Sequence, residues 1–245
     1  MRNNMQPCVE RYGRLPYVTD LSSTPNSSQM MTPCWITEWL LRDDVRDITA
    51  VTTMASSYNY AHRLKEVYFT GWNTSNVTTF AACFNGCYDL KYIPLNNIST
   101  DSATTFDSMF YNCFMLDNIN INHFNIDKVT TMSSMFYNCK SLKNLDMSNL
   151  IGTGKLVNLT SMFRDCRVLE EIDIKNLNVS SVTTFSGMFY GCRKLKYIDL
   201  STWDTSSATN FSDMFNLCQV LQVVDTSNFD TTHVTTTNAM FKDCI

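Results

Sequence analysis

The chain has 245 residues, is 44% hydrophobic and 17% charged, and carries a formal net charge of −4. Gly and Pro number only 7 and 5, which excludes a collagen-like or linker-like chain. The acidic balance predicts no basic surface for nucleic acid or an anionic membrane. Because no stretch is apolar enough to cross a bilayer, we also expect no membrane span.

Residues 1–50 differ in composition from the rest of the chain. The stretch from Tyr12 to Cys34 is polar and rich in turn-forming residues, and Trp35 to Ile48 fits a short helix or an irregular strand. We interpret 1–50 as an N-terminal cap or attachment segment. Within it, Cys8 and Cys34 are candidates for a disulfide, which would indicate an extracellular setting. The first residues lack the apolar core of a secretory signal.

A block of about 26 residues then repeats over 51–245. The copies are marked by a leucine, most of them three residues after a cysteine, at Leu64, Leu90, Leu116, Leu142, Leu169, Leu195 and Leu221. The first copy has Ser57 and Ala61 in place of Met and Cys, as terminal repeats commonly do. The period predicts a solenoid of about seven repeats.

The first half of each unit alternates in polarity. In Leu195–Leu200, the apolar residues Leu195, Ile198 and Leu200 fit the buried face of a short strand, and the residues between them are free to point outward. This is the LxxLxL core of a leucine-rich repeat. The first half therefore predicts one strand per unit.

The second half of each unit has a helical spacing. Its apolar residues fall at i, i+3, i+6, i+7 and i+10, as in Ala208, Phe211, Met214, Phe215 and Cys218. That spacing fits one face of a short helix, capped by the Ser and Thr residues before it. Stacked units would then form an α/β leucine-rich-repeat solenoid, with a parallel sheet on a concave side and short helices on the opposite wall.

The stretch from Leu200 to Cys218 resembles the BspA-like leucine-rich-repeat surface proteins. It carries most of that family's Asp-Leu-Ser-x-Trp-Asp-Thr-Ser run and its Met-Phe-x-x-Cys motif, and the resemblance extends from Val51 to Ile245. It implies a surface-exposed or secreted protein concerned with adhesion. Similar repeats occur in phage proteins, so a virion or tail-fibre component is the alternative.

Seven cysteines occupy the same slot in successive units: Cys87, Cys113, Cys139, Cys166, Cys192, Cys218 and Cys244. Because the slot lies on the apolar face, free thiols packed as small hydrophobes are the first interpretation. Disulfides between units and a metal array are the alternatives. His62, His123 and His233 are scattered and no CxxC pair exists, which disfavours a metal.

Four aspartates, Asp146, Asp173, Asp199 and Asp225, share one outward strand position. Like charges stacked this closely repel each other. Three explanations remain open: solvation with local hydrogen bonds and nearby lysines, a cationic partner, or a bound divalent ion such as calcium.

The outward strand positions define the predicted partner-binding face. Its residues are Lys65, Tyr68, Lys91, Tyr92, Asn118, Lys143, Asp146, Glu171, Asp173, Lys196, Tyr197, Asp199 and Asp225. Tyr68, Tyr92 and Tyr197 are the expected anchors, since interfaces favour Tyr.

No catalytic motif is recognisable, so we expect no enzyme, cofactor or metal site. The sequence instead predicts a binding module for a protein or glycan. The chain stops at Ile245, where a next strand would begin, which predicts either a truncation or another chain packed on that edge.

Overall fold

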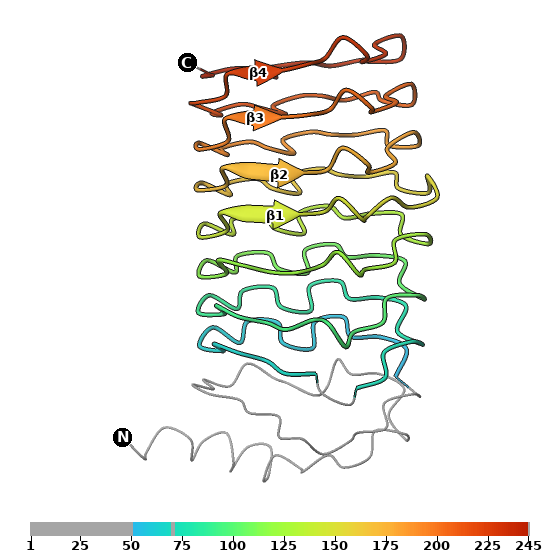
Figure 1. Ribbon diagram of the computed structural model, residues 1–245, viewed down its shortest axis with the longest axis vertical. Helices are drawn as coiled ribbons and strands as arrows, with labels where there is room; N and C mark the ends of the chain where they lie inside the picture. The colour runs from blue at the N-terminus through green and yellow to red at the C-terminus, as the bar shows by residue number, and fades with distance from the viewer. Residues whose placement is uncertain (1–50, 70–71, 245) are drawn as a thin grey trace.

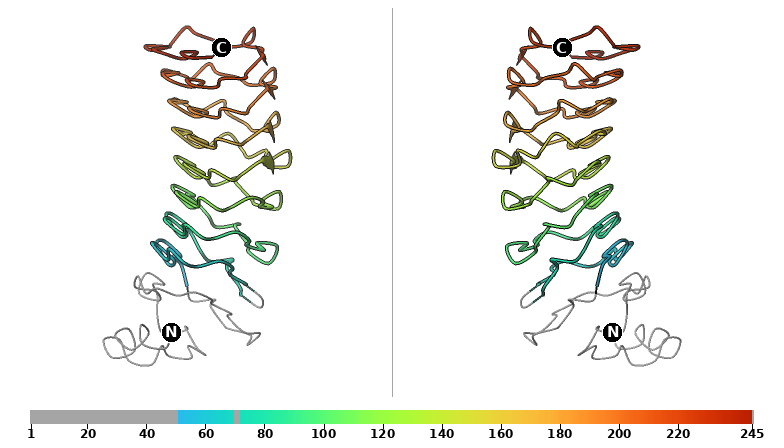
Figure 2. Two further views of the ribbon diagram at one scale, coloured as in Figure 1. Left: turned by 90° about the vertical axis from the view of Figure 1, so that its left-hand side faces the viewer. Right: turned by 90° about the vertical axis from the view of Figure 1, so that its right-hand side faces the viewer.

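The computed structural model describes residues 51–69 and 72–244. They form flat coils stacked in a nearly straight column, with the chain advancing by one level per repeat (Figures 1 and 2). Each coil has a strand wall, formed by the LxxLxL half, and a turn wall, formed by the second half. The predicted cap over 1–50, with its Cys8 and Cys34, lies outside the described residues.

The strand wall confirms the parallel arrangement expected from the alternating half. Its strands are β1 (Asn144–Asp146), β2 (Glu171–Asp173), β3 (Tyr197–Ile198) and β4 (Val223–Val224). β1 pairs in parallel with β2, and β3 with β4. The register sets Leu145 beside Ile172, both buried, while the residues on either side point outward. An isolated bridge between Glu66 and Tyr92 extends the same pairing to an earlier coil.

The expected helices are wrong for the described residues, because the turn wall consists of tight turns. Parallel bridges join eight successive positions along this wall: Thr53, Thr79, Thr105, Thr131, Asn158, Thr184, Asn210 and Thr236. After each bridge, successive backbone amides donate alternately to a carbonyl of the next coil and to a carbonyl of their own coil. Phe136 N donates to Met162 O of the next coil at 2.9 Å, whereas Tyr137 N donates to Ser134 O within its own coil at 3.1 Å.

Left-handed residues explain why a helix does not form. Every coil has two positions with positive φ, four residues apart, such as Ser134 (55°) and Asn138 (61°). A helix needs negative φ at each residue and internal bonds to the carbonyl four residues back. Here every second amide turns outward to the neighbouring coil instead. The apolar residues at i, i+3, i+6, i+7 and i+10 therefore belong to successive tight turns, whose spacing is similar to that of one face of a helix.

The absence of helices from the described coils also changes the shape expected of the stack. Helices pack about 8 to 10 Å apart, whereas strands lie about 4.8 Å apart, so a wall of helices opposite a sheet forces the stack to curve. In this protein the turn wall is hydrogen-bonded from coil to coil throughout, and the strand wall at several coils, so the two walls share one spacing. The strand wall is accordingly close to flat rather than concave (Figure 2).

A row of stacked rings runs through the core behind the turn wall. Phe110, Phe136 and Phe163 lie with their ring centroids 5.5 and 5.7 Å apart and nearly parallel. The row starts at Tyr58 and ends at Phe241. Such stacking requires coils separated by one strand spacing, so the rings and the turn geometry support each other.

The repeated cysteines form a second buried row, and the interpretation as free thiols is confirmed. Those from Cys87 to Cys218 are buried and unpaired, and Cys244 is partly exposed. Each thiol donates to a carbonyl of the preceding coil, as Cys139 Sγ does to Phe110 O at 3.2 Å. Burial raises the pKa of the Cys139 thiol well above its usual value. The slot is therefore a packing position that also satisfies a buried carbonyl.

The last described coil is less covered than the others. Val224, Phe229, Val234 and Met240 pack against the core but are only partly buried. The expected packing partner at this edge stays a prediction.

Candidate functional site

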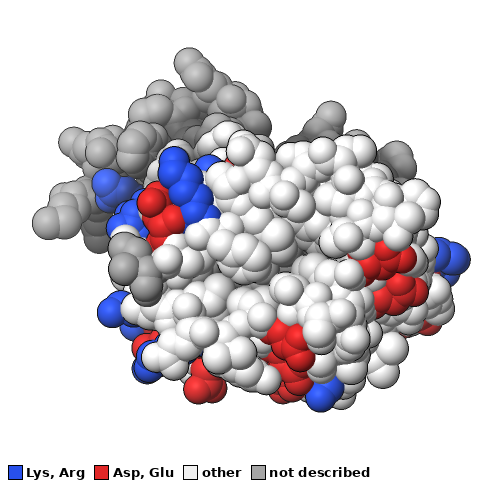
Figure 3. All heavy atoms as spheres, turned by 90° about the horizontal axis from the view of Figure 1, so that it is seen from above, with Lys and Arg blue, Asp and Glu red and all other residues white. Residues whose placement is uncertain are grey.

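The strand face is the outward side of the strand wall. The structure exposes the residues predicted there, except Tyr68 and Asp199, which are half-buried. Three outward columns run along the stack. One begins at Lys65 and one at Glu66, and the third contains the aspartates. Seen from above, charges gather in a few groups at the rim of the molecule, and most of the visible surface is uncharged (Figure 3).

Charges of opposite sign pair within the column of the strand face that begins at Lys65. Lys91 pairs with Asp117 at 3.9 Å and Lys143 with Glu170 at 3.6 Å, in each case along one column between adjacent coils. Alternation of sign along this column thus replaces repulsion by weak ion pairs. The other two columns contain carboxylates and no lysine, so the strand face as a whole is acidic.

The aspartate column is stabilised by local hydrogen bonds. Asp146 accepts from Ser148 N at 2.9 Å, and Asp225 accepts from Ser227 N, also at 2.9 Å. Asp199 accepts from both the amide and the hydroxyl of Ser201. These bonds, with the Lys175 ammonium 3.1 Å away, lower the pKa of Asp199 to about 2. Local bonding thus accounts for the column, and the described residues contain no cluster suited to a metal ion.

Two of the three expected tyrosine anchors stand free on this face. Tyr92 and Tyr197 are 51% and 58% exposed, and they occupy the same column. Tyr68 instead donates its hydroxyl to Glu66 Oε2 at 2.9 Å, and this bond raises its pKa. Tyr92 and Tyr197 are therefore better placed as anchors than Tyr68.

Sequence reasoning missed Val223, which lies beside Tyr197 in the β3–β4 register and is 56% exposed. Its signal was present in the repeat, because Val223 holds the slot that Tyr92 and Tyr197 hold in their own units. An apolar residue at an outward strand position has no packing role. Tyr197 and Val223 together form an exposed apolar patch on the strand face.

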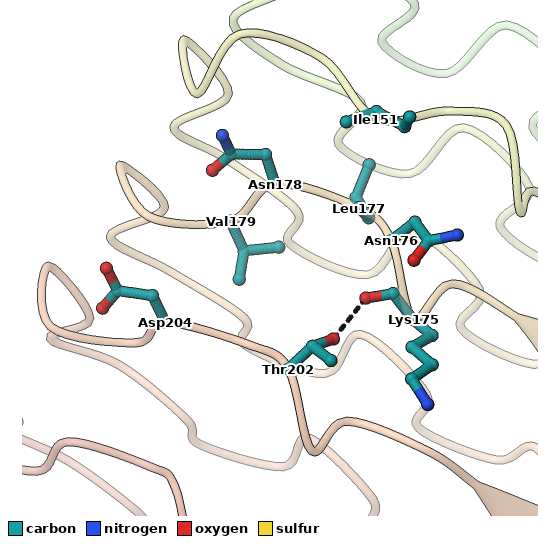
Figure 4. A pocket seen from close by; sticks show the side chains of 8 residues that line it. All are labelled: Ile151, Lys175, Asn176, Leu177, Asn178, Val179, Thr202 and Asp204. Atoms are coloured by element: carbon teal, nitrogen blue, oxygen red, sulfur yellow. Dashed lines mark hydrogen bonds between the residues drawn. The ribbon is translucent and has the colours of Figure 1, made fainter.

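A shallow depression of about 320 Å³ lies at the edge of the strand wall where the chain leaves it, after the C-terminal ends of the strands (Figure 4). Leu177 and Val179 line it, and Thr202 closes one side by donating to the carbonyl of Lys175. The Lys175 side chain extends away from it toward Asp199. The groups around it form no nucleophile–base pair, so it offers no catalytic arrangement.

Comparison with known proteins identifies the family to which the repeat belongs. A family model described as "Mycoplasma protein of unknown function, DUF285" matches residues 28–150 and 153–245. No curated protein matches the sequence. In the described part of the chain no helix is long and apolar enough to cross a membrane.

Several solved structures are similar. A leucine-rich-repeat protein from Bacteroides ovatus is 20% identical with a TM-score of 0.50, and the match covers 70% of this chain and 40% of that one. A leucine-rich-repeat protein from Eubacterium ventriosum is 24% identical with a TM-score of 0.43, covering 76% and 43%. The T. pallidum protein TpLRR is 20% identical with a TM-score of 0.41, covering 65% and 67%. The Bacteroides likeness confirms the leucine-rich-repeat fold, and this chain spans about 40% of that protein's length.

Proposed function

Because the chain belongs to the DUF285 family and has the fold of a leucine-rich-repeat protein, we propose that it is a non-enzymatic module that binds a protein partner through the strand face. The observation that carries the proposal is the exposed column of Tyr92, Tyr197 and Val223. Large apolar side chains on a rigid wall are the usual anchors of a protein interface. A glycan is the alternative ligand for the same face.

The surroundings of the patch indicate the character of the partner. Asp199 and Asp225 follow Tyr197 and Val223 by two residues, directly after the ends of β3 and β4, and so point to the same face. The low pKa of Asp199 keeps its carboxylate ionised at neutral pH. A partner that places an apolar side chain over Tyr197 and a Lys or Arg beside the aspartates would match this surface.

We propose a location at the cell surface on the resemblance of the repeat to BspA-like surface proteins. The virion role expected as an alternative has no observation of the described residues in its favour.

Site-specific photocrosslinking tests the binding face. A photoreactive phenylalanine analogue replaces Tyr197 in the full chain, and a matched variant carries it at Thr130 on the turn wall. After irradiation with cells or cell extracts, we expect a discrete protein adduct from position 197 and none from position 130. Equal adducts from both positions, or adducts from position 130 alone, would refute binding through the strand face.

Substitution of the anchors provides the second test. In Y92A/Y197A the fold should persist, since both side chains are about half exposed, while the yield of an adduct formed from position 223 should fall about tenfold. An undiminished adduct would mean that these tyrosines are not anchors.

A further inference from the structure

A second surface lies at the corner where each coil passes from the turn wall into the strand wall, on the side of Figure 1 from which the strand arrows start. Three successive coils place five cations there, which we call the basic corner: Lys140, Arg164, Arg167, Arg193 and Lys194. Backbone bonds tie these coils together, from Asn138 N to Arg164 O at 2.6 Å and from Asp165 N to Tyr190 O at 2.7 Å. Neighbouring cations are thus about one strand spacing apart along the stack.

The charge of the basic corner is mostly uncompensated. Arg167 pairs with Asp165 at 3.3 Å, but the other four cations form no ion pair with any described residue. On the strand face, Lys91 and Lys143 each have a carboxylate within 4 Å. The net charge of −4 therefore averages over a local excess of cations at this corner. A local excess of cations attracts and orients an anionic partner.

Aromatic stacking holds two of these cations in place. The Arg164 guanidinium lies 3.7 Å from the centroid of the Tyr190 ring, and the Lys140 ammonium lies 4.2 Å from that of Phe114. Gly187 leaves room for Arg164, since a Cβ there would stand 3.2 Å from its Nη1 atom. Cations already held in position lose less conformational freedom when they bind a ligand.

The groups that remain available at the corner are hydrogen-bond donors. The faces of the neighbouring rings are occupied by one another, as in Tyr111 with Tyr137 at 4.5 Å and Tyr88 with Phe114 at 4.7 Å. Sugar rings therefore have few free aromatic faces on which to stack. Guanidinium, ammonium and phenol groups match carboxylate oxygens, and Arg with Tyr is the composition favoured at protein interfaces.

We propose that the basic corner binds an acidic segment of a protein, rich in Asp and Glu, independently of the strand face. The carboxylates would lie along the stack axis, with forked bonds to Arg164 and Arg193 and point contacts to Lys140 and Lys194.

The test uses the full chain and a fluorescein-labelled polyglutamate as the probe, with fluorescence anisotropy at physiological salt. Arg164→Gln with Arg193→Gln removes two charges from the corner, and Lys128→Gln with Lys155→Gln removes two from elsewhere. We expect the dissociation constant to rise about tenfold in the first pair and less than about twofold in the second. Equal weakening in both pairs would show attraction by overall charge alone and overturn the proposal.

Further variants and probes keep the outcome decisive. Arg164→Lys with Arg193→Lys preserves the charge but not the fork, so we expect about a threefold loss. If the glutamine pair does not fold, as judged by circular dichroism, Lys140→Gln with Lys194→Gln replaces it, and an unchanged dissociation constant there counts against the proposal. Tighter binding of polygalacturonate or of a thymidine oligonucleotide than of polyglutamate would assign the corner to a glycan or a nucleic acid instead.

Discussion

The turn wall is joined from coil to coil by an unbroken row of parallel bridges from Thr53 to Thr236, whereas bridges occur at only some of the described coils of the strand wall. No bridge joins Asn118 to Tyr92 before it or to Asn144 after it. The segment around Asn118 reads Asp-Asn-Ile-Asn-Ile, and Asp and Asn are poor strand formers.

That difference suggests separate roles for the two walls: the turn wall stabilises the stack, and the strand wall carries the proposed binding face. The stacked rings and the buried thiols lie behind the turn wall, where one coil depends on the next. The strand wall contributes buried leucines to the same core but leaves its outer columns free to vary. The half of the repeat that gives the leucine-rich motif its name is thus the less continuous half, and it is the one on which we place the binding face.

Alkaline pH should destabilise the packing behind the turn wall, and the resulting loss of folding stability is the largest effect we expect. Among the described residues, seven cysteines are buried and free: Cys83, Cys87, Cys113, Cys139, Cys166, Cys192 and Cys218. Desolvation raises the pKa of each, so the folded chain keeps protons that the unfolded chain releases above about pH 8.5. Stability is unaffected below that pH and falls as pH rises, by up to about 1.4 kcal/mol per pH unit for each thiol.

The sum over seven thiols approaches about 10 kcal/mol per pH unit, comparable with the whole stability of a typical domain. We therefore expect cooperative unfolding between about pH 9 and 10.5, followed by circular dichroism. Replacing Cys139 and Cys166 by Ala should make the transition less steep with pH. A stack that stays folded at pH 11 would contradict the role of the thiols.

Phe136→Ala should produce the next largest loss. Its ring is fully buried between Phe110 and Phe163, so truncation leaves a cavity and interrupts the stacked row. We expect the free energy of unfolding to fall by about 3 to 5 kcal/mol in urea titrations. Tyr197→Ala on the strand face is the control, with a change of about 0.5 kcal/mol or less. Similar losses for both would remove the distinction between the walls.

Gly191→Ala distinguishes turns from helices by the sign of its effect. In a helix this change stabilises by about 0.5 to 1 kcal/mol. At Gly191 φ is 70°, and a Cβ would stand 3.0 Å from Asp165 Oδ1. We therefore expect destabilisation by about 1 to 2 kcal/mol, measured by urea denaturation. Leu217→Asn, at the equivalent position of the next coil with φ of 63°, should be neutral or stabilising. A stabilising Gly191→Ala would favour the helical interpretation.

The same position shows why the strand wall was predictable and the turn wall was not. Within Leu195–Leu200, the residues from Tyr197 onward alternate between outward and buried positions, and a period of two fits a strand and not a helix. The spacing of Phe211, Met214 and Phe215 fits a helix as well as tandem turns. The distinguishing signal was the residue before each cysteine, as in Gly86, Asn112 and Asn138, since Gly and Asn tolerate positive φ.

The candidate sites divide in the same way. Outward strand positions such as Tyr92 and Tyr197 follow directly from the alternation. The basic corner was not predictable, because net charge averages over the whole chain and Lys140, Arg164 and Arg193 are far apart in sequence. They come together because each occupies a corner position in successive coils.

The smallest effect on stability that we expect comes from Asp199 on the strand wall at acidic pH. The hydroxyl and amide of Ser201, then Lys175, lower the pKa of Asp199 to about 2. A lowered pKa contributes stability above the unfolded value of about 3.9, and this contribution is lost as pH falls from there toward 2. Because Asp199 lies at the surface, we expect Asp199→Asn to cost only about 0.2 to 1 kcal/mol at pH 6 and nothing near pH 2.

Carboxyl chemical shifts in an NMR titration separate the two causes. Ser201→Ala should raise the pKa of Asp199 more than Lys175→Met does, since it removes the short hydroxyl bond within the turn, whereas the lysine is a solvated partner. Added salt should weaken the Lys175 contribution and leave that of Ser201 in place. If Lys175→Met had the larger effect, the aspartate column would be held by ion pairs between coils, and the strand wall would be coupled from coil to coil more strongly than its bridges indicate.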